Sequence, residues 1–130
     1  MQQHLLLVDD DRDEALIFEE ALSKLPFDHR FICNYAYSAE QALEILEFVT
    51  PDYIFVDLNM PRVNGIDFLF MLKGKFDPRY TKVYIRSMMI SDETARLAKF
   101  AGAAGCIKKA NSIQDITNEL SEVLASSNMA

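Results

Sequence analysis

The sequence predicts an α/β fold, a three-layer sandwich in which helices cover both faces of a five-stranded parallel sheet. Short apolar runs alternate along the chain with longer segments whose apolar residues recur at helical spacing. The short runs are apolar at consecutive positions, which is typical of strands buried on both faces. Right-handed crossovers between such strands place helices on both sides of the sheet.

The first two strand–helix units have clear local signals. Residues 4–8 form the first expected strand, and a helix over residues 11–24 follows with apolar side chains at helical spacing. The aromatic and apolar run 31–37 predicts the second strand. Ser38 and Gln41 have the spacing of a capping box, which predicts that a helix begins there.

The next two units follow the same pattern. Residues 53–56 predict the third strand, and Gly65 opens the third helix. Residues 82–86 predict the fourth strand, followed by a helix that starts at residue 91 or 92 and ends at residue 101. Gly102 suits the position after that helix, because glycine readily adopts the left-handed backbone that ends many helices.

The fifth strand is expected over residues 105–108, and its helix begins near Ser112. Five such units favour the strand order 2-1-3-4-5, as in flavodoxin-like folds. A chain of 130 residues fits one domain of ordinary size. We therefore expect residues 1–125 to form the domain and residues 126–130 to form a short tail.

Composition argues against several classes of protein. The net charge is -7 and no cluster of Lys and Arg appears, whereas a nucleic-acid-binding protein needs a basic face. No apolar stretch approaches the ~20 residues of a membrane span. Three aspartates follow Val8, unlike the apolar core of a signal peptide. We therefore expect a cytoplasmic protein that binds neither nucleic acid nor a membrane.

The two cysteines, Cys33 and Cys106, lie in separate apolar, strand-like runs. Two such residues do not make a disulfide framework, and neither belongs to a cluster with zinc-ligand spacing. We expect both to be small buried side chains.

Polar and charged residues stand where four of the predicted strands end: Asp9, Asp10, Asp57, Ser87 and Lys109. The carboxyl ends of parallel strands meet at one edge of the sheet, where ligands bind in open α/β folds. We therefore expect these five side chains to gather in one pocket. Three carboxylates, a hydroxyl and an ammonium suit a divalent cation together with a phosphoryl group.

Three neighbouring carboxylates repel one another, which raises their pKa values unless a cation compensates. A hard divalent ion with oxygen ligands, Mg2+ above all, provides that compensation. Helix capping is the alternative explanation for acids at the start of a helix. It accounts for Asp11 but not for Asp57, which precedes a turn. Lys109 or Ser87 alone would be an ordinary surface or strand-end residue, so only the combination is specific.

With these residues the chain resembles the receiver domain of two-component response regulators, especially the stand-alone chemotaxis-type members. The resemblance covers essentially the whole chain. It rests on Val8-Asp9-Asp10, Val56-Asp57-Leu58-Asn59-Met60-Pro61 with Asn64-Gly65 after it, Ser87, and Gly102-Ala103 leading to Lys109.

The resemblance implies a signalling role centred on Asp57. In such domains this aspartate accepts a phosphoryl group from a phosphohistidine, while residues corresponding to Lys109 and Ser87 contact the phosphoryl oxygens. The resemblance also implies an Mg2+ (or Mn2+) site. Asp10 and Asp57 would be ligands, Asp9 would act largely through water, and the backbone carbonyl of Asn59 would complete the protein ligands.

The implied partners are a sensor histidine kinase or a histidine phosphotransfer protein, and a downstream protein bound by the fourth helix, fifth strand and fifth helix. The resemblance implies phosphorylation and dephosphorylation of Asp57 only, not turnover of external substrates. We expect a monomer or a weak homodimer.

Three residues depart from the family pattern. Cys106 replaces a Tyr or Phe whose ring moves during switching, which predicts an incomplete or rerouted conformational change. Ala110 replaces a proline that is often cis, so we expect a trans bond after Lys109. Met88 replaces a small residue and is expected to restrict entry to the site. The cluster Met88-Met89-Ile90 either folds into the core or forms a partner-binding patch.

These departures leave a second hypothesis, a degenerate receiver that binds proteins without phosphorylation; the five intact site residues argue against it. A phosphatase of the haloacid dehalogenase type is a further alternative. Such enzymes typically carry Asp-x-Asp followed by Gly-Thr, whereas this chain reads Asp9-Asp10-Asp11-Arg12. A flavin site is disfavoured because the acidic loop after the first strand would repel a phosphate.

Overall fold

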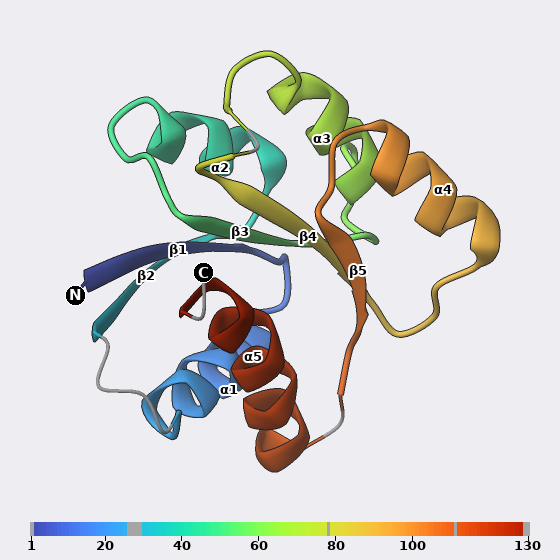
Figure 1. Cartoon of the computed structure of the whole chain (residues 1–130). Coiled ribbons are helices and arrows are strands. Elements are labelled where there is room, and N and C mark those ends of the chain that lie inside the picture. Colours follow the sequence, from blue (N-terminus) through green and yellow to red (C-terminus); the bar gives the residue numbers. More distant parts are fainter. Residues whose placement is uncertain (1, 26–29, 78, 111, 129–130) are drawn as a thin grey trace.

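The computed structural model describes residues 2–25, 30–77, 79–110 and 112–128. Within these ranges, parallel strands and helices alternate along the chain, and the strand order is β2-β1-β3-β4-β5 (Figure 1). The α/β fold and the order predicted from the sequence are therefore confirmed. The elements are β1 (Gln2–Val8), α1 (Arg12–Ser23), β2 (Arg30–Ala36), α2 (Ala39–Leu46), β3 (Tyr53–Asp57), α3 (Gly65–Leu72), β4 (Lys82–Ser87), α4 (Asp92–Phe100), β5 (Gly105–Lys108) and α5 (Ile113–Asn128).

The sheet separates two hydrophobic cores. Figure 1 shows α2, α3 and α4 on one face of the sheet and α1 and α5 on the other. Successive strand residues point to opposite faces, so Leu6, Val8, Ile54 and Val56 pack on the first side. Their neighbours Leu5, Leu7, Tyr53 and Phe55 pack on the second side, together with Phe18 of α1. This division explains why the strands are apolar at consecutive positions.

Strand register brings the ends of the central strands level. Val8 pairs with Val56, and Asp57 pairs with Arg86 on the next strand. Ser87 in turn pairs with Lys108. β3 and β4 are each one residue longer than the sequence indicates, because Asp57 and Ser87 are their last residues rather than the residues after them, while β2 lies one residue earlier than the expected 31–37.

Local signals fix the helix starts and ends. The Ser38 hydroxyl accepts a hydrogen bond from the Gln41 N–H, while the Gln41 side chain accepts one from the Tyr37 N–H rather than from Ser38 as in a standard capping box. A Cβ on Gly65 would lie 2.7 Å from the carbonyl oxygen of Asp57, so only glycine lets α3 begin this close to the site. Gly102 has the expected left-handed backbone after α4.

The C-terminal helix runs further than predicted. α5 ends at Asn128, so it enters the range 126–130 that the sequence suggests as a tail. Cys33 and Cys106 are half-buried free thiols that pack against the two cores. None of the described helices combines the length and hydropathy that crossing a bilayer requires.

Candidate functional site

Three aspartates meet at the carboxyl edge of β1 and β3. Asp9 and Asp57 are buried, and Asp10 between them in sequence order is exposed to solvent. One carboxylate oxygen from each lies within 4.8 Å of the others, a spacing that a single cation could bridge. The fourth nearby acid, Asp11, instead caps α1 by accepting a hydrogen bond from the Asp13 N–H, as the capping alternative predicts.

Lys109 supplies the positive charge at this edge. Its Nζ donates a hydrogen bond to Asp9 Oδ2 at 3.0 Å and lies 3.4 Å from Asp57 Oδ1. β5 places it there, because the Lys109 N–H continues the sheet by donating to the Ser87 carbonyl. The lysine is buried, and this explains why its ammonium lies against carboxylates instead of in water.

The electrostatics of the site favour bound positive charge. Burial raises the pKa of Asp57, and the charge of Asp9 raises it further, while Lys109 and the Asn59 N–H only partly oppose the shift. Burial by itself would lower the pKa of Lys109, but the carboxylates around it outweigh burial and raise the pKa. Repulsion from a neighbouring carboxylate thus contributes to the raised pKa of Asp57, after the larger effect of burial.

Ser87 and Asn59 complete the arrangement on the β4 side. The Asn59 N–H donates to Asp57 Oδ1 at 3.2 Å, and its side-chain amide donates to the Ser87 hydroxyl at 3.5 Å. Ser87 is buried at the end of β4, beside Asp57 at the end of β3. All the residues that the sequence assigns to the site thus lie at one edge.

Glu14 belongs to this site and was missed at the level of sequence. Its Oε2 lies 3.7 Å from the Lys109 Nζ, so it is a third acid beside this amine. It stands in the first turn of α1, three residues after the N-cap Asp11. An acid in the helix that directly follows the Asp9 strand end is a signal that could have identified it, but acids in a first turn also stabilise helices without any site.

Comparison with known proteins agrees with this geometry. The model of the response regulator receiver domain matches residues 5–121. The chain belongs to the response regulator receiver domain family. Receiver domains are the phosphoacceptor modules of two-component systems and are signalling proteins rather than turnover enzymes.

Relatives of this receiver domain include longer proteins. It is 31% identical over 107 residues to the sensory/regulatory protein RpfC of Xanthomonas campestris, covering 81% of this chain and 14% of that protein. It is 28% identical over 121 residues to the nitrate/nitrite response regulator protein NarL of Escherichia coli, covering 93% of this chain and 54% of NarL. The receiver domain thus spans about half the length of some curated relatives and less of others.

Solved structures share its fold. The chemotaxis protein CheY4 of Vibrio cholerae superposes with a TM-score of 0.80 at 21% identity, covering 95% of this chain and 99% of CheY4. A two-component response regulator from Clostridium difficile gives a TM-score of 0.80 at 16% identity, covering 98% and 99%.

The structure shows the surroundings of the three residues that depart from the receiver pattern, Cys106, Ala110 and Met88. Cys106 is half buried, and burial raises the pKa of its thiol. The peptide bond between Lys109 and Ala110 is trans, as predicted. Met88 and Met89 are 52% and 82% exposed, so the alternative that they fold into the core is wrong.

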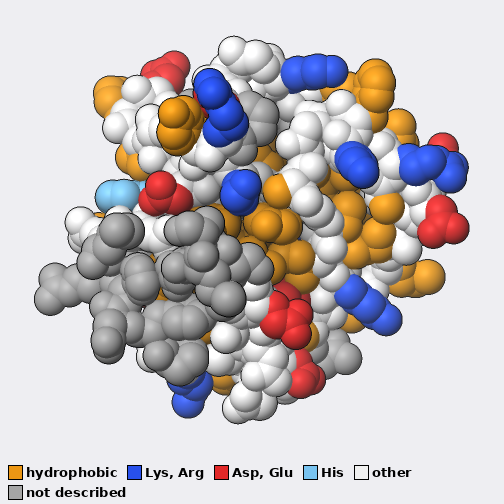
Figure 2. Space-filling view, viewed as in Figure 1, with side chains coloured by type: hydrophobic (Ala, Val, Ile, Leu, Met, Phe, Trp, Pro, Cys, Tyr) orange, Lys and Arg blue, Asp and Glu red, His pale blue; other side chains and the backbone are white. Residues whose placement is uncertain are grey.

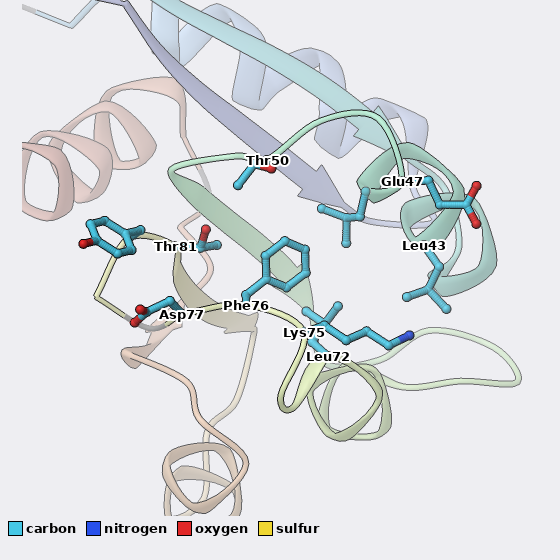
Figure 3. A pocket seen from close by; sticks show the side chains of 10 residues that line it. Leu43, Glu47, Thr50, Leu72, Lys75, Phe76, Asp77 and Thr81 are labelled. Carbon is cyan, nitrogen blue, oxygen red and sulfur yellow. The ribbon is translucent and has the colours of Figure 1, made fainter.

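A separate hollow of about 590 Å³ lies at the opposite edge of the sheet, between the end of α2 and the segment after α3 (Figure 3). Leu43, Leu72 and Phe76 give it an apolar lining, and two acids and one base, Glu47, Asp77 and Lys75, add charge. It contains none of the predicted site residues, so the acidic edge is the candidate site.

Proposed function

We propose that this receiver domain accepts a phosphoryl group on Asp57 from a phosphohistidine, in an Mg2+-dependent reaction, and thereby changes its protein contacts. One observation carries the proposal: the ammonium of Lys109 contacts the carboxylates of Asp9 and Asp57, and the exposed carboxylate of Asp10 converges with these two acids. Negative charge exceeds positive charge here, which suits a cation and a transferred PO3 unit.

The transfer needs little covalent chemistry from the protein. A carboxylate oxygen of Asp57 attacks phosphorus, the bond from phosphorus to the imidazole nitrogen breaks, and an acyl phosphate forms. Lys109 offsets the charge on the phosphoryl oxygens, and the Ser87 hydroxyl donates a hydrogen bond to one of them. Water later attacks phosphorus, which releases inorganic phosphate and restores Asp57.

The residues present fit a divalent cation. Asp9, Asp10 and Asp57 offer oxygens close enough for one ion, and a lone amine leaves their charge incompletely balanced. In this proposal Asp10 and Asp57 hold Mg2+ or Mn2+ directly, Asp9 acts through water, and the Asn59 carbonyl is a further ligand. Bound metal supplies positive charge that lowers the repulsion between the anionic nucleophile and the anionic phosphoryl group.

The proposed donor is a sensor histidine kinase or a histidine phosphotransfer protein. The proposed output surface is the face of α4, β5 and α5, and Met88 and Met89 extend it on the loop before α4. Exposed methionines suit a contact surface, because their side chains adapt to varied partners. A cytoplasmic location, a monomeric or weakly dimeric state and the lack of nucleic-acid binding stay predictions.

Acetyl phosphate tests the proposal. With Mg2+, intact-mass spectrometry is expected to show one added phosphoryl group on the wild type and none on Asp57→Asn. Asp11→Asn is the matched control, since it removes a neighbouring acid outside the cluster and is expected to be phosphorylated normally.

Two results would favour the degenerate receiver instead. One is no added mass on the wild type with either Mg2+ or Mn2+. The other is the same added mass on Asp57→Asn. Turnover of a generic aryl phosphate would instead favour the phosphatase alternative.

A further inference from the structure

Helices α3 and α4 carry an aromatic pair on the molecular surface. The ring centroids of Phe70 and Phe100 lie 6.3 Å apart, with planes tilted by 56°. The two residues are 41% and 71% exposed. Folded proteins usually bury aromatic rings, so an adjacent exposed pair indicates a contact surface.

Lys73 joins this pair to a hollow. Its Nζ lies 4.8 Å from the centroid of Phe100 and 5.9 Å from that of Phe70, within range of cation–π attraction. Lys73 also lines a hollow of about 310 Å³ with an apolar wall that includes Leu72 and Ala101. Ligand pockets begin at about 300 Å³, so this one has room for a large apolar side chain.

The acids of α3 and α4 stand in their first turns (Asp67, Asp92 and Glu93), and the C-terminal parts of both helices, where the patch lies, carry only basic charges. Segments 68–76 and 94–105 contain no acidic residue, and their four basic residues are Lys73, Lys75, Arg96 and Lys99, in a chain of net charge -7. Arg96 is exposed and stands four residues before Phe100, on the same side of α4. Figure 2 shows hydrophobic and basic side chains together over the upper parts of α3 and α4.

We propose that this aromatic–basic patch, made of Phe70, Lys73, Arg96, Phe100 and the hollow beside them, docks an acidic amphipathic segment of a partner protein. An apolar side chain of that segment enters the hollow, and its carboxylates face Lys73 and Arg96. Charge complementarity selects this occupant, because the patch is a positive area on a negative protein.

A nucleic acid is the disfavoured occupant, although aromatic and basic side chains also bind single strands. Its affinity depends on many phosphate contacts. The two cations of the patch, on a chain of net charge -7, provide few of them.

The patch lies away from the phosphorylation chemistry. Phe70 and Phe100 stand in the last turns of α3 and α4, and these helices begin near the carboxyl edge of the sheet that holds Asp57. Docking is therefore measured on the unphosphorylated domain, so its failure is distinct from failure of the proposed phosphoacceptor function.

The test uses the full chain and a synthetic helical peptide with Leu and Phe on one face and only Asp and Glu on the other. Amide chemical-shift mapping is expected to place the peptide at the ends of α3 and α4, with binding that weakens as salt is added. Phe100→Ala and Lys73→Glu are each expected to weaken binding by about tenfold or more. Phe48→Ala is the matched control, because Phe48 is 87% exposed and outside the patch.

Five outcomes overturn the proposal. Four are binding results: no binding of the acidic peptide, shifts centred on another face, equal weakening by Phe48→Ala, and tighter binding of a single-stranded oligonucleotide of similar charge. Concentration-dependent self-association that Phe100→Ala abolishes would assign the patch to a second copy of this chain and would also overturn it.

Discussion

Lys109 and Arg86 are both buried cations near the carboxyl edge of the sheet, but their surroundings differ. Lys109 faces three acids, donates a hydrogen bond to Asp9, and lies at an edge where Asp10 is exposed. Among the acids that the structure describes, Arg86 pairs with Glu119 of α5 alone, at 3.3 Å between Nε and Oε2, and its guanidinium lies 5.1 Å from the centroid of the Phe18 ring.

Hydrogen bonding separates the two regions further. Among the described residues, the guanidinium nitrogens of Arg86 and both carboxylate oxygens of Glu119 have no partner in good hydrogen-bond geometry. The Arg86 pair is balanced in charge and enclosed, whereas the Lys109 cluster has excess negative charge and an opening. Charge imbalance and access therefore distinguish a candidate reactive site from a structural ion pair, and burial does not.

The largest expected effect comes from Glu119→Leu. Arginine stays protonated in proteins, so this change leaves Arg86 as a buried cation without an anion. We expect the free energy of unfolding to fall by about 3–5 kcal/mol, measured by urea denaturation. The double variant Arg86→Met/Glu119→Leu is expected within about 1 kcal/mol of the wild type. A double variant as unstable as Glu119→Leu would show that packing, not charge, determines the loss.

Arg86→Met alone is expected to lower the free energy of unfolding less, by about 1–2 kcal/mol. The remaining Glu119 can bind a proton, and burial already raises its pKa despite the opposing charge of Arg86. The folded state then binds more protons than the unfolded state, so stability falls as pH rises through the raised pKa. The deficit relative to wild type should be larger at about pH 8 than at about pH 5; an equal deficit would contradict this account.

Asp57→Asn tests the Lys109 cluster, and here we expect the substitution to raise the stability of the metal-free protein rather than lower it. Burial and the charge of Asp9 raise the folded-state pKa of Asp57, so its ionised form opposes folding once pH exceeds the unfolded-state pKa. Without metal at neutral pH, the variant should have a higher Tm than wild type, although Lys109 loses one neighbour. Mg2+ should raise the Tm of wild type more than that of the variant. A lower Tm of the metal-free variant would mean that Lys109 already compensates Asp57.

The sequence predicts one of these regions and not the other, for a physical reason. Asp57 ends a strand and Asp9 and Lys109 directly follow one, and parallel strands must bring their carboxyl ends to one edge. Arg86 stands inside a strand, where the pattern says only that it is buried. Its partner Glu119 depends on how α5 is rotated and packed, and no local signal specifies that rotation.

Loop paths are equally hard to predict from local pattern. Met88 and Met89 are apolar enough for the core, yet their exposure depends on how the chain leaves β4 for α4. Glu14 is similar, because an acid in a first helical turn is explained by the helix alone. In each case a tertiary contact, rather than a propensity, determines the role.

The smallest expected effect comes from Asp11→Asn. This variant tests whether Mg2+ binds to three converging carboxylates or is attracted by general negative charge. Asparagine caps helices as well as aspartate does, so the free energy of unfolding should change by less than about 0.5 kcal/mol. Asp11 lies outside the cluster of metal-spaced oxygens, whereas Asp10 lies within it. The Mg2+-induced rise in Tm should therefore survive Asp11→Asn and largely disappear in Asp10→Asn. Equal losses in both variants would mean that general negative charge, rather than three converging carboxylates, attracts the ion.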